Sequence, residues 1–396
     1  MGNCFAPSKP NIYPKEPKPT DILKSSDIIE NDPNIKRMNT EILAIKRENI
    51  EKGLLTDVQN SLVKDIENLM ARPIKDFLQT PHKYLLINSV IVTTEQHGFD
   101  NKQIKSIAEG YDSSELGLQN LGIAYSCKKG VKHSPNKDDF FILIDGEMKI
   151  FGVMDGHGIY GHFCSDFVKQ LLPKLILSNP NLKLNVELAL TQSFLKVNDA
   201  LVAISTKTGK FSSSLSGTTA TVVIQKNNNL YVAHVGDSRS VMSVSEKSGG
   251  YKVVDLTRDH SPNLEDEKTR IIQNGGDVRK DKDRGPYRVF ARGGNYPGLA
   301  MSRAIGDTAS KEFGIISDPE IKVIKLESNE EFFLLCSDGV WEFLSSKDVI
   351  EFVHSKGGYH QLSSTCEKIA EKSFNLWLDR EGYTTDDITC LLIYLK

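Results

Sequence analysis

Apolar residues in the first part of the chain recur at steps of three and four residues, which places their side chains on one face of a helix. The positions with this spacing are Ile35, Met38, Ile42 and Ile45, then Leu55, Val58, Leu62, Ile66 and Leu69. The pattern predicts one long helix, or two helices separated near Gly53, that ends before Pro73. It is shorter than the sustained heptads of a coiled coil, so we expect a helical extension docked on the main domain.

Short apolar runs predict strands along the rest of the chain. The first such run is residues 83–92, and residues 97–118 look like a polar connection. Further strands are expected at residues 121–127, 140–144, 150–154, 219–225, 230–235, 240–244, 252–256, 321–325, 332–336 and 388–395. Helices are expected at residues 161–177, 186–205, 346–355 and 359–378. Many strands follow one another without a helix between them, so we expect an α+β fold with antiparallel sheets rather than a doubly wound parallel sheet.

The chain divides into three expected parts: a proline-rich tether over residues 1–33, the helical extension over residues 34–118, and a catalytic domain over residues 119–396. The N-terminus reads Met-Gly-Asn-Cys, which places Gly2 where myristate is added and Cys4 where palmitate could join it. The Ser or Thr that usually completes the myristoylation motif is Ala6 here, and a plain tail is the alternative interpretation. Because two acyl chains anchor where one exchanges, we expect a cytoplasmic protein held at the cytosolic face of a membrane.

Composition excludes several classes of protein. The 396 residues are 39% hydrophobic and 26% charged, with a net charge of −3, which gives no general attraction to nucleic acid. The six cysteines form no C-x-x-C pair, which favours reduced intracellular thiols over a disulfide framework or a zinc ribbon. No apolar run approaches the length of a membrane-spanning helix. We expect a monomeric globular protein.

Residues 148–161 hold the most informative motif: an apolar strand that ends at Asp155, a turn, and an amphipathic helix. Asp155 can bind a hard cation, Gly156 lets a backbone carbonyl approach it, and His157 can move a proton. The same glycines match the G-x-G-x-x-G loop of dinucleotide-binding proteins. Asp155 would repel a pyrophosphate and no acidic residue lies about 20 positions further on, so we favour a metal site. A plain turn is the third alternative.

Aspartates also end or precede other apolar strands far apart in the sequence. These residues are Asp237, Asp338 and the pair Asp386-Asp387. Each alone is an ordinary turn signal. Together with Asp155 they supply the oxygen ligands that Mg²⁺ or Mn²⁺ prefers, and several carboxylates can gather only if cations neutralise them. The sequence therefore predicts two metal ions.

Seven motifs occur in an order that resembles the metal-dependent serine/threonine protein phosphatases of the PPM class, type 2C, from Gly122 to the C-terminus. The motifs are Asp155-Gly-His-Gly158, Ser216-Gly-Thr-Thr-Ala220, Val235-Gly-Asp-Ser-Arg239, Asp259-His-Ser-Pro262, Leu299-Ala-Met-Ser-Arg-Ala-Ile-Gly-Asp307, Ser337-Asp-Gly-Val-Trp341 and Asp386-Asp-Ile-Thr389.

The resemblance implies a four-layer αββα sandwich with a dinuclear Mg²⁺ or Mn²⁺ centre at one end of the strands. It also implies ligands: Asp155 bridging both ions, the Gly156 carbonyl on the second, Asp338 and Asp386 on the first, and Asp237 with Asp338 and Glu342 at a weaker third site. The family often has Asp at the position of Glu342.

The same resemblance implies hydrolysis of phosphoserine and phosphothreonine in protein substrates. Two cations would lower the pKa of a bridging water, hydroxide would attack phosphorus directly, and His157 would protonate the leaving oxygen. No cysteine nucleophile is needed, so Cys164 is expected in the core. The alternative function is a pseudophosphatase that acts as a binding protein on the same fold.

The sequence departs from the family at its first motif. Lys132 stands where a phosphate-binding Arg is usual and offers a point charge without the bidentate fork. Lys137 stands where Glu is usual, which leaves Asp138 as the aligned acid near the second metal. Because an ammonium repels a neighbouring cation, we expect weaker binding of the second metal.

A cluster of basic residues covers residues 279–292. We favour a solvated loop for this segment. The functional alternative is a flap beside the cleft that meets acidic or phosphorylated substrate surfaces.

Overall fold

A nine-stranded antiparallel sheet lies at the centre of the computed structural model, which describes residues 57–90, 103–132, 134–280 and 285–395. The strand order is β15-β8-β7-β5-β4-β1-β2, and β6 and β14 extend the end of β5. The strands are β1 (Tyr84–Val90), β2 (Gln103–Glu109), β4 (Asp138–Asp145), β5 (Met148–His157), β6 (Gly217–Thr218), β7 (Ala220–Lys226), β8 (Asn229–Val235), β14 (Ile305–Gly306) and β15 (Glu320–Lys325).

A second antiparallel sheet packs on the first, with the order β10-β9-β16-β17-β3. Its strands are β3 (Ile123–Lys128), β9 (Arg239–Ser245), β10 (Tyr251–Asp255), β16 (Glu330–Cys336) and β17 (Ile388–Tyr394). Every strand pair of the two large sheets is antiparallel. The dinucleotide-loop interpretation required a parallel sheet, which neither of these sheets is.

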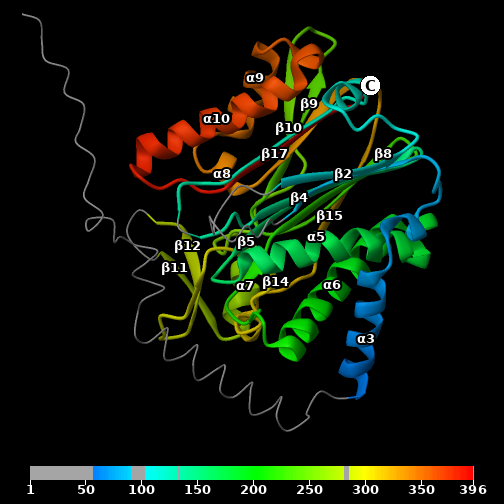
Figure 1. Ribbon diagram of the computed structural model, residues 1–396. Helices are drawn as coiled ribbons and strands as arrows, with labels where there is room; N and C mark the ends of the chain where they lie inside the picture. The colour runs from blue at the N-terminus through cyan, green and yellow to red at the C-terminus, as the bar shows by residue number, and fades with distance from the viewer. Residues whose placement is uncertain (1–56, 91–102, 133, 281–284, 396) are drawn as a thin grey trace, which may run out of the picture. The chain divides into compact units, whose positions relative to one another are not determined.

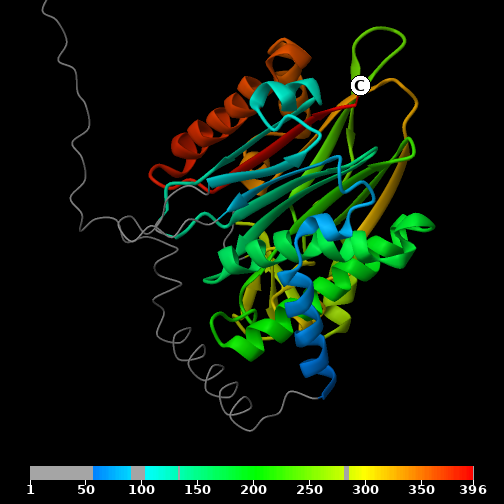
Figure 2. The same ribbon diagram turned by 45° about the vertical axis from the view of Figure 1, so that its right-hand side comes forward.

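Helices cover the outer faces of both sheets (Figures 1 and 2). On the nine-stranded sheet these are α5 (Gly161–Ser178) and α6 (Val186–Thr208), with α3 (Asp57–Ala71) beside them. On the five-stranded sheet they are α8 (Asp338–Trp341), α9 (Ser346–Ser355) and α10 (Leu362–Glu381). This confirms the expected four layers. The remaining helices are α4 (Glu115–Asn120) and α7 (Glu265–Gln273), with 3-10 turns at Ile74–Phe77, Pro180–Lys183, Lys311–Phe313 and Gly358–Gln361.

The core between the two sheets explains why β4 and β5 are nearly continuous apolar runs. All eight residues of β4 are buried. Phe140 and Phe151 are fully buried there, and the Phe151 ring meets Phe333 of the other sheet edge-on at 5.6 Å between centroids. A strand that is buried on both faces needs apolar residues at every position, so it lacks the apolar–polar alternation of a half-exposed strand. The same burial specifies the pairing register, and the register determines where each strand ends.

The amphipathic pattern of the N-terminal extension is confirmed for α3, while residues 1–56 lie outside the described part of the chain. Leu62, Ile66 and Leu69 pack against the helical layer of α5 and α6. The Lys174 ammonium on α5 donates to the carbonyls of Leu69, Met70 and Arg72, at 3.2, 2.8 and 2.7 Å. These carbonyls lie at the C-terminal end of α3, where the last carbonyls of a helix lack hydrogen-bond donors within the helix. The negative end of the helix dipole also favours a cation at this position.

Residues 97–118 are not merely the expected polar connection, because they contain β2 and the start of α4. β1 pairs with both β2 and β4, so the described part of the extension adds two strands to the large sheet. β2 escaped prediction because it is an edge strand whose apolar residues are exposed: Ile104 is 38% and Ile107 41% accessible.

Residues 276–280 and 285–299 contain a small three-stranded sheet, whereas a solvated loop was expected over residues 279–292. Its strands are β11 (Gly276–Lys280), β12 (Tyr287–Ala291) and β13 (Pro297–Leu299), in the order β11-β12-β13. Three buried residues, Ile271, Val289 and Ile315, form its core. Because this core is so small, few positions of the segment must be apolar, and basic residues therefore dominate its sequence.

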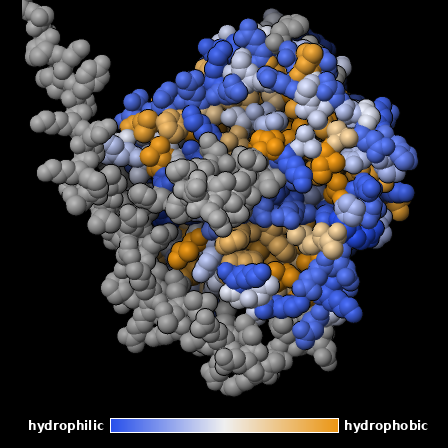
Figure 3. Space-filling view, viewed as in Figure 1, coloured by the Kyte–Doolittle hydropathy of each residue, from blue (hydrophilic) through white to orange (hydrophobic). Residues whose placement is uncertain are grey.

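Hydrophilic residues predominate on the face seen in Figure 3, with apolar residues in groups between them. Among the described residues, no helix combines the length and the apolar composition needed to cross a membrane.

Candidate active site

Asp138 and Asp155 face each other across the pairing of β4 and β5. Directly opposed side chains on an antiparallel pair lie about 5 Å apart, and like charges there repel. Both residues lie at the end of otherwise apolar strands, so the fold of the core brings the two carboxylates together. The sequence predicts both as metal ligands.

The second sheet contributes two more acids. Asp338 begins α8 directly after β16, and Asp386 lies two residues before β17. The carboxyl groups of Asp155 and Asp338 are within hydrogen-bonding reach, and both interact electrostatically with Asp138 and Asp386. Acids that are distant in sequence therefore meet where the ends of the two sheets come together.

Burial and mutual repulsion disfavour the ionised forms of these carboxyls. Burial, then the charge of Asp387, raises the pKa of Asp138 to about 7. Burial, then Asp386, raises the pKa of Asp338 to about 7, and burial with Asp338 raises that of Asp155 well above its usual range. Such a group can be fully ionised at neutral pH only if positive charge is added.

Lys132 supplies part of that positive charge. Its ammonium lies 2.5 Å from Asp386 Oδ1 and 2.7 Å from Asp387 Oδ2. Burial disfavours the charged form of Lys132, but the charges of Asp386 and Asp387 outweigh burial and raise the pKa of the lysine. Burial also disfavours the ionised form of Asp386, but the charge of Lys132 outweighs burial and lowers the pKa of that carboxyl. Lys132, expected at the substrate phosphate, therefore contacts an expected metal ligand.

Asp387 positions the loop that carries both lysines of the first motif. Its carboxylate accepts hydrogen bonds from the backbone N–H groups of Gly130 and Lys137, each at 2.8 Å. The side chain is 1% exposed. The charge of the half-buried Lys137 favours the ionised form of Asp386 and opposes the imidazolium of His157, so its ammonium is near enough to the candidate site to act on both.

Asp237 completes the acidic group from the end of β8. The chain turns there at Gly236, whose φ of +97° favours glycine. Burial, then Asp338, raises the pKa of Asp237 to about 8. Glu342, by contrast, is an exposed residue. Partial loss of hydration at its carboxyl, together with the charges of Glu381 and Asp386, raises the pKa of Glu342.

The donor set fits a hard divalent cation. Within the described residues, Asp237 Oδ1 and Asp338 Oδ1 are buried and have no hydrogen-bond partner. A buried carboxylate oxygen without a donor is costly unless a cation meets it. Yet no three His, Cys, Asp or Glu side chains of the described residues already stand in a metal-holding arrangement, so the carboxylates must reorient to chelate.

His157 is held by an aspartate whose role the sequence analysis did not assign. Its Nε2 lies 2.6 Å from Asp307 Oδ2. Burial opposes the imidazolium, but the charge of Asp307 outweighs burial and raises the pKa of His157. Asp307 appears in the motif that ends at residue 307, but only the fold shows that it meets His157. Arg303 of the same motif binds the buried Glu267.

Glycines of the catalytic motifs make these approaches possible. A Cβ on Gly217 would stand 2.2 Å from Asp307 Oδ2 and 2.9 Å from His157 Nε2. A Cβ on Gly156 would stand 2.2 Å from the Gly161 carbonyl oxygen. The G-x-G-x-x-G spacing therefore reflects backbone packing between the end of β5 and the start of α5, not a cradle for a pyrophosphate.

Two further expectations concern residues outside this group. Cys164 is fully buried, and burial raises the pKa of its thiol, which confirms a core residue rather than a nucleophile. Gly2 and Cys4 lie outside the described residues.

The comparison with known proteins agrees with this geometry. The family model for protein phosphatase 2C matches residues 131–380. The chain is 34% identical over 328 residues to the probable protein phosphatase 2C 35 of Arabidopsis thaliana, covering 74% of this chain and 91% of that protein. It is 31% identical over 299 residues to the probable protein phosphatase 2C 7 of Oryza sativa subsp. japonica, covering 74% and 70%.

Solved structures share the fold. A serine-threonine phosphatase 2C from Toxoplasma gondii superimposes with a TM-score of 0.62 at 22% identity, covering 69% of this chain and 94% of that one. A sex determining protein of C. elegans superimposes with a TM-score of 0.58 at 22% identity, covering 70% and 65%.

Proposed function

The chain belongs to the protein phosphatase 2C family, and we propose that it hydrolyses phosphoserine and phosphothreonine in other proteins by a metal-dependent reaction. The observation that supports this most directly is the carboxylate group formed by the buried Asp138 and the half-buried Asp155, Asp338 and Asp386. Three of these acids have pKa values raised by burial and by one another's charges, which is expected at a catalytic centre rather than in a structural core.

We propose that these side chains hold two Mg²⁺ or Mn²⁺ ions. Asp155 would contact both, Asp338 and Asp386 the first, and Asp138 with the Gly156 carbonyl the second. Asp237, with Asp338 and Glu342, would form a weaker third site. When bound, such ions supply an activated water for direct attack on phosphorus and offset the charge on the phosphoryl oxygens.

His157 is proposed as the general acid that gives a proton to the departing serine or threonine oxygen. An acid must hold its proton until the bond to phosphorus breaks, and the raised pKa caused by Asp307 favours that form. Because Nε2 faces Asp307, the opposite ring nitrogen, Nδ1, is the one left for substrate; it is buried and has no hydrogen-bond partner among the described residues.

Lys132 and Lys137 are proposed to meet the substrate phosphate. Lys132 is now held by Asp386 and Asp387, so it would exchange this contact for the phosphate when metal neutralises Asp386. The charge of Lys137 acts on His157 and Asp386. Lys132 stands where the family usually has Arg, and Lys137 stands where it usually has Glu. Each would offer the phosphate a single ammonium charge.

The second candidate function is a pseudophosphatase that binds phosphoproteins without turnover. It is favoured by one observation, the ammonium of Lys132 on the expected metal ligand Asp386. If that contact persisted, it would compete with the first metal for the carboxylate.

Hydrolysis of a phosphoserine peptide separates the two functions. We expect phosphate release with Mn²⁺ or Mg²⁺ and none above background in excess chelator. Peptide binding without metal-dependent release would support the pseudophosphatase. Full activity in chelator would contradict the proposed mechanism.

A further inference from the structure

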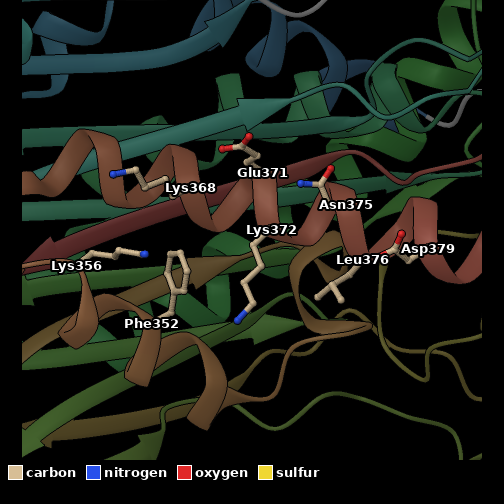
Figure 4. A pocket seen from close by; sticks show the side chains of 8 residues that line it. All are labelled: Phe352, Lys356, Lys368, Glu371, Lys372, Asn375, Leu376 and Asp379. Carbon is tan, nitrogen blue, oxygen red and sulfur yellow. The ribbon is translucent and has the colours of Figure 1, made fainter. Parts of the chain in front are cut away.

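A groove lies between α9 and α10 (Figure 4). Its cavity volume is about 340 Å³. None of the residues that line it is a candidate metal ligand or proton donor. The lining residues are Phe352, Lys356, Lys368, Glu371, Lys372, Asn375, Leu376 and Asp379.

Two lysine ammoniums converge on one aromatic ring in this groove. Lys356 Nζ lies 4.9 Å and Lys372 Nζ 5.0 Å from the centre of the Phe352 ring. Figure 4 shows the ring standing between the two side chains. Ammonium groups are attracted to the face of an aromatic ring. This attraction keeps the positive charges of Lys356 and Lys372 close together at the Phe352 ring.

The lysine charges are only partly offset by the protein: in the described part of the chain, Asp348 interacts electrostatically with Lys372. Among the described residues, no ion pair joins Lys356, Lys368 or Lys372 to a carboxylate, whereas the nearby Lys347 pairs with Glu351 at 3.5 Å. Lys368 and Lys372 are also four residues apart on α10, where like charges destabilise a helix. An anion bound in the groove would relieve this repulsion.

The acidic residues of the lining lie away from the ring. Figure 4 shows the Glu371 carboxylate on the side of α10 opposite the Phe352 ring, and Asp379 further along the helix. Phe352 and Leu376 add a half-buried apolar floor beside the lysines. The lysine end of the groove therefore suits an anionic chain that also carries an apolar side chain.

The groove leads toward the candidate active site. α10 ends at Glu381, whose charge acts on Glu342, and Glu342 in turn neighbours Asp386. Glu381 lies nine positions after Lys372, which is about 13 Å along a helix. An extended peptide covers that length in about four residues.

We propose that this groove binds an acidic segment of the phosphoprotein substrate, at least four residues from the phosphorylated serine or threonine. This inference rests on the proposed function, since it names the substrate class of the same enzyme. A peptide suits the site better than an anionic membrane, because a membrane surface would also face the carboxylates of Glu371 and Asp379, whereas a peptide can bind at the lysine end of the groove alone.

Binding can be measured without turnover. The probe is a fluorescent, unphosphorylated peptide of eight residues containing glutamates and one leucine, followed by fluorescence anisotropy. In the double variant Lys368→Glu/Lys372→Glu we expect at least a tenfold rise in Kd. The control Lys247→Glu/Lys347→Glu makes the same change in net charge on exposed lysines outside the groove and should leave Kd within twofold. Thermal unfolding of both variants confirms that they are folded.

Kinetics then connect the groove to catalysis. For a phosphopeptide with an acidic run, Lys368→Glu/Lys372→Glu should raise KM about tenfold without a change in kcat, and hydrolysis of an aryl phosphate should not change. Equal peptide affinity in the wild type and the groove variant would overturn the proposal, as would an equal loss in the control. Loss of binding to phosphatidylserine vesicles, with peptide binding unaffected, would also overturn it. Peptide binding by a protein without phosphatase activity would instead count against the proposed function alone.

Discussion

Asp307 holds the imidazole of His157 at 2.6 Å and raises its pKa. We expect Asp307→Asn to lower kcat for a phosphoserine peptide by about tenfold or more, since a general acid contributes on the order of a hundredfold. Hydrolysis of an aryl phosphate should change much less, because that leaving group needs no proton. The measurement compares the two substrates, with His157→Ala as the control that removes the acid entirely.

The pH profile adds a second readout to the same variant. The charge of Asp307 favours imidazolium, so its removal lowers the pKa of His157 and moves the alkaline fall of activity to lower pH. An unchanged profile, or equal losses on the two substrates, would assign Asp307 a purely structural role.

Lys137 is the sharpest departure from the family pattern, and its charge already acts on Asp386. Replacing this ammonium with a carboxylate should favour a nearby cation. We expect Lys137→Glu to lower the Mn²⁺ concentration for half-maximal activity, and Asp138→Asn to raise it. Titration of activity with Mn²⁺ checks both variants. A higher metal requirement in Lys137→Glu would mean that this motif has been misaligned.

Single-residue roles were only partly predictable from sequence. Asp155, Asp237, Asp338 and Asp386 follow or precede apolar strands, and that signal was enough to group them. Asp387 carries the same signal and Asp307 does not; their partners are backbone groups of a loop and a histidine 150 positions away. Contacts of this kind depend on the packing of two sheets, which no local pattern specifies.

At the scale of elements, α7 depends on one buried charge. Glu267 is fully buried and accepts hydrogen bonds from Arg270, Arg303 and Ser302. Burial opposes its ionised form, but these donors outweigh burial and lower its pKa. The network joins α7 to the segment that leads to Asp307.

We expect Glu267→Ala to lower the free energy of unfolding by about 3–5 kcal/mol, because it leaves buried arginine charge unpaired. Urea unfolding measures the loss. The control Glu265→Ala, on the exposed face of the same helix, should cost less than about 0.5 kcal/mol. Similar losses in the two variants would contradict the account of this network.

Elements with a broad apolar face were predicted well, and elements without one were missed. The expected helix at residues 346–355 has the bounds of α9, because Ser345 and Asp348 form a capping box at its start. α7 was missed since its buried positions are Glu267 and Ile271, a charge and a single apolar residue. The strands β11 to β13 were missed because their core contains only three buried residues.

At the scale of the whole molecule, we propose that acylation at Gly2 and Cys4 holds the phosphatase on a membrane. Gly2→Ala should move the protein to the soluble fraction of cells, and Cys4→Ser should weaken its retention, because one acyl chain binds only marginally. Cell fractionation checks both. An unchanged membrane fraction in Gly2→Ala would refute acylation as the anchor. The expected monomer stays a prediction.

The central claim is that buried carboxylates around Asp155 hold the metals that drive phosphate release. Its most direct test is the rate of phosphate release from a phosphoserine peptide at saturating Mn²⁺, in the wild type and in Asp155→Asn. We predict a loss of on the order of a hundredfold or more in the variant, since Asp155 would contact both ions. Equal rates in the two proteins would contradict the account.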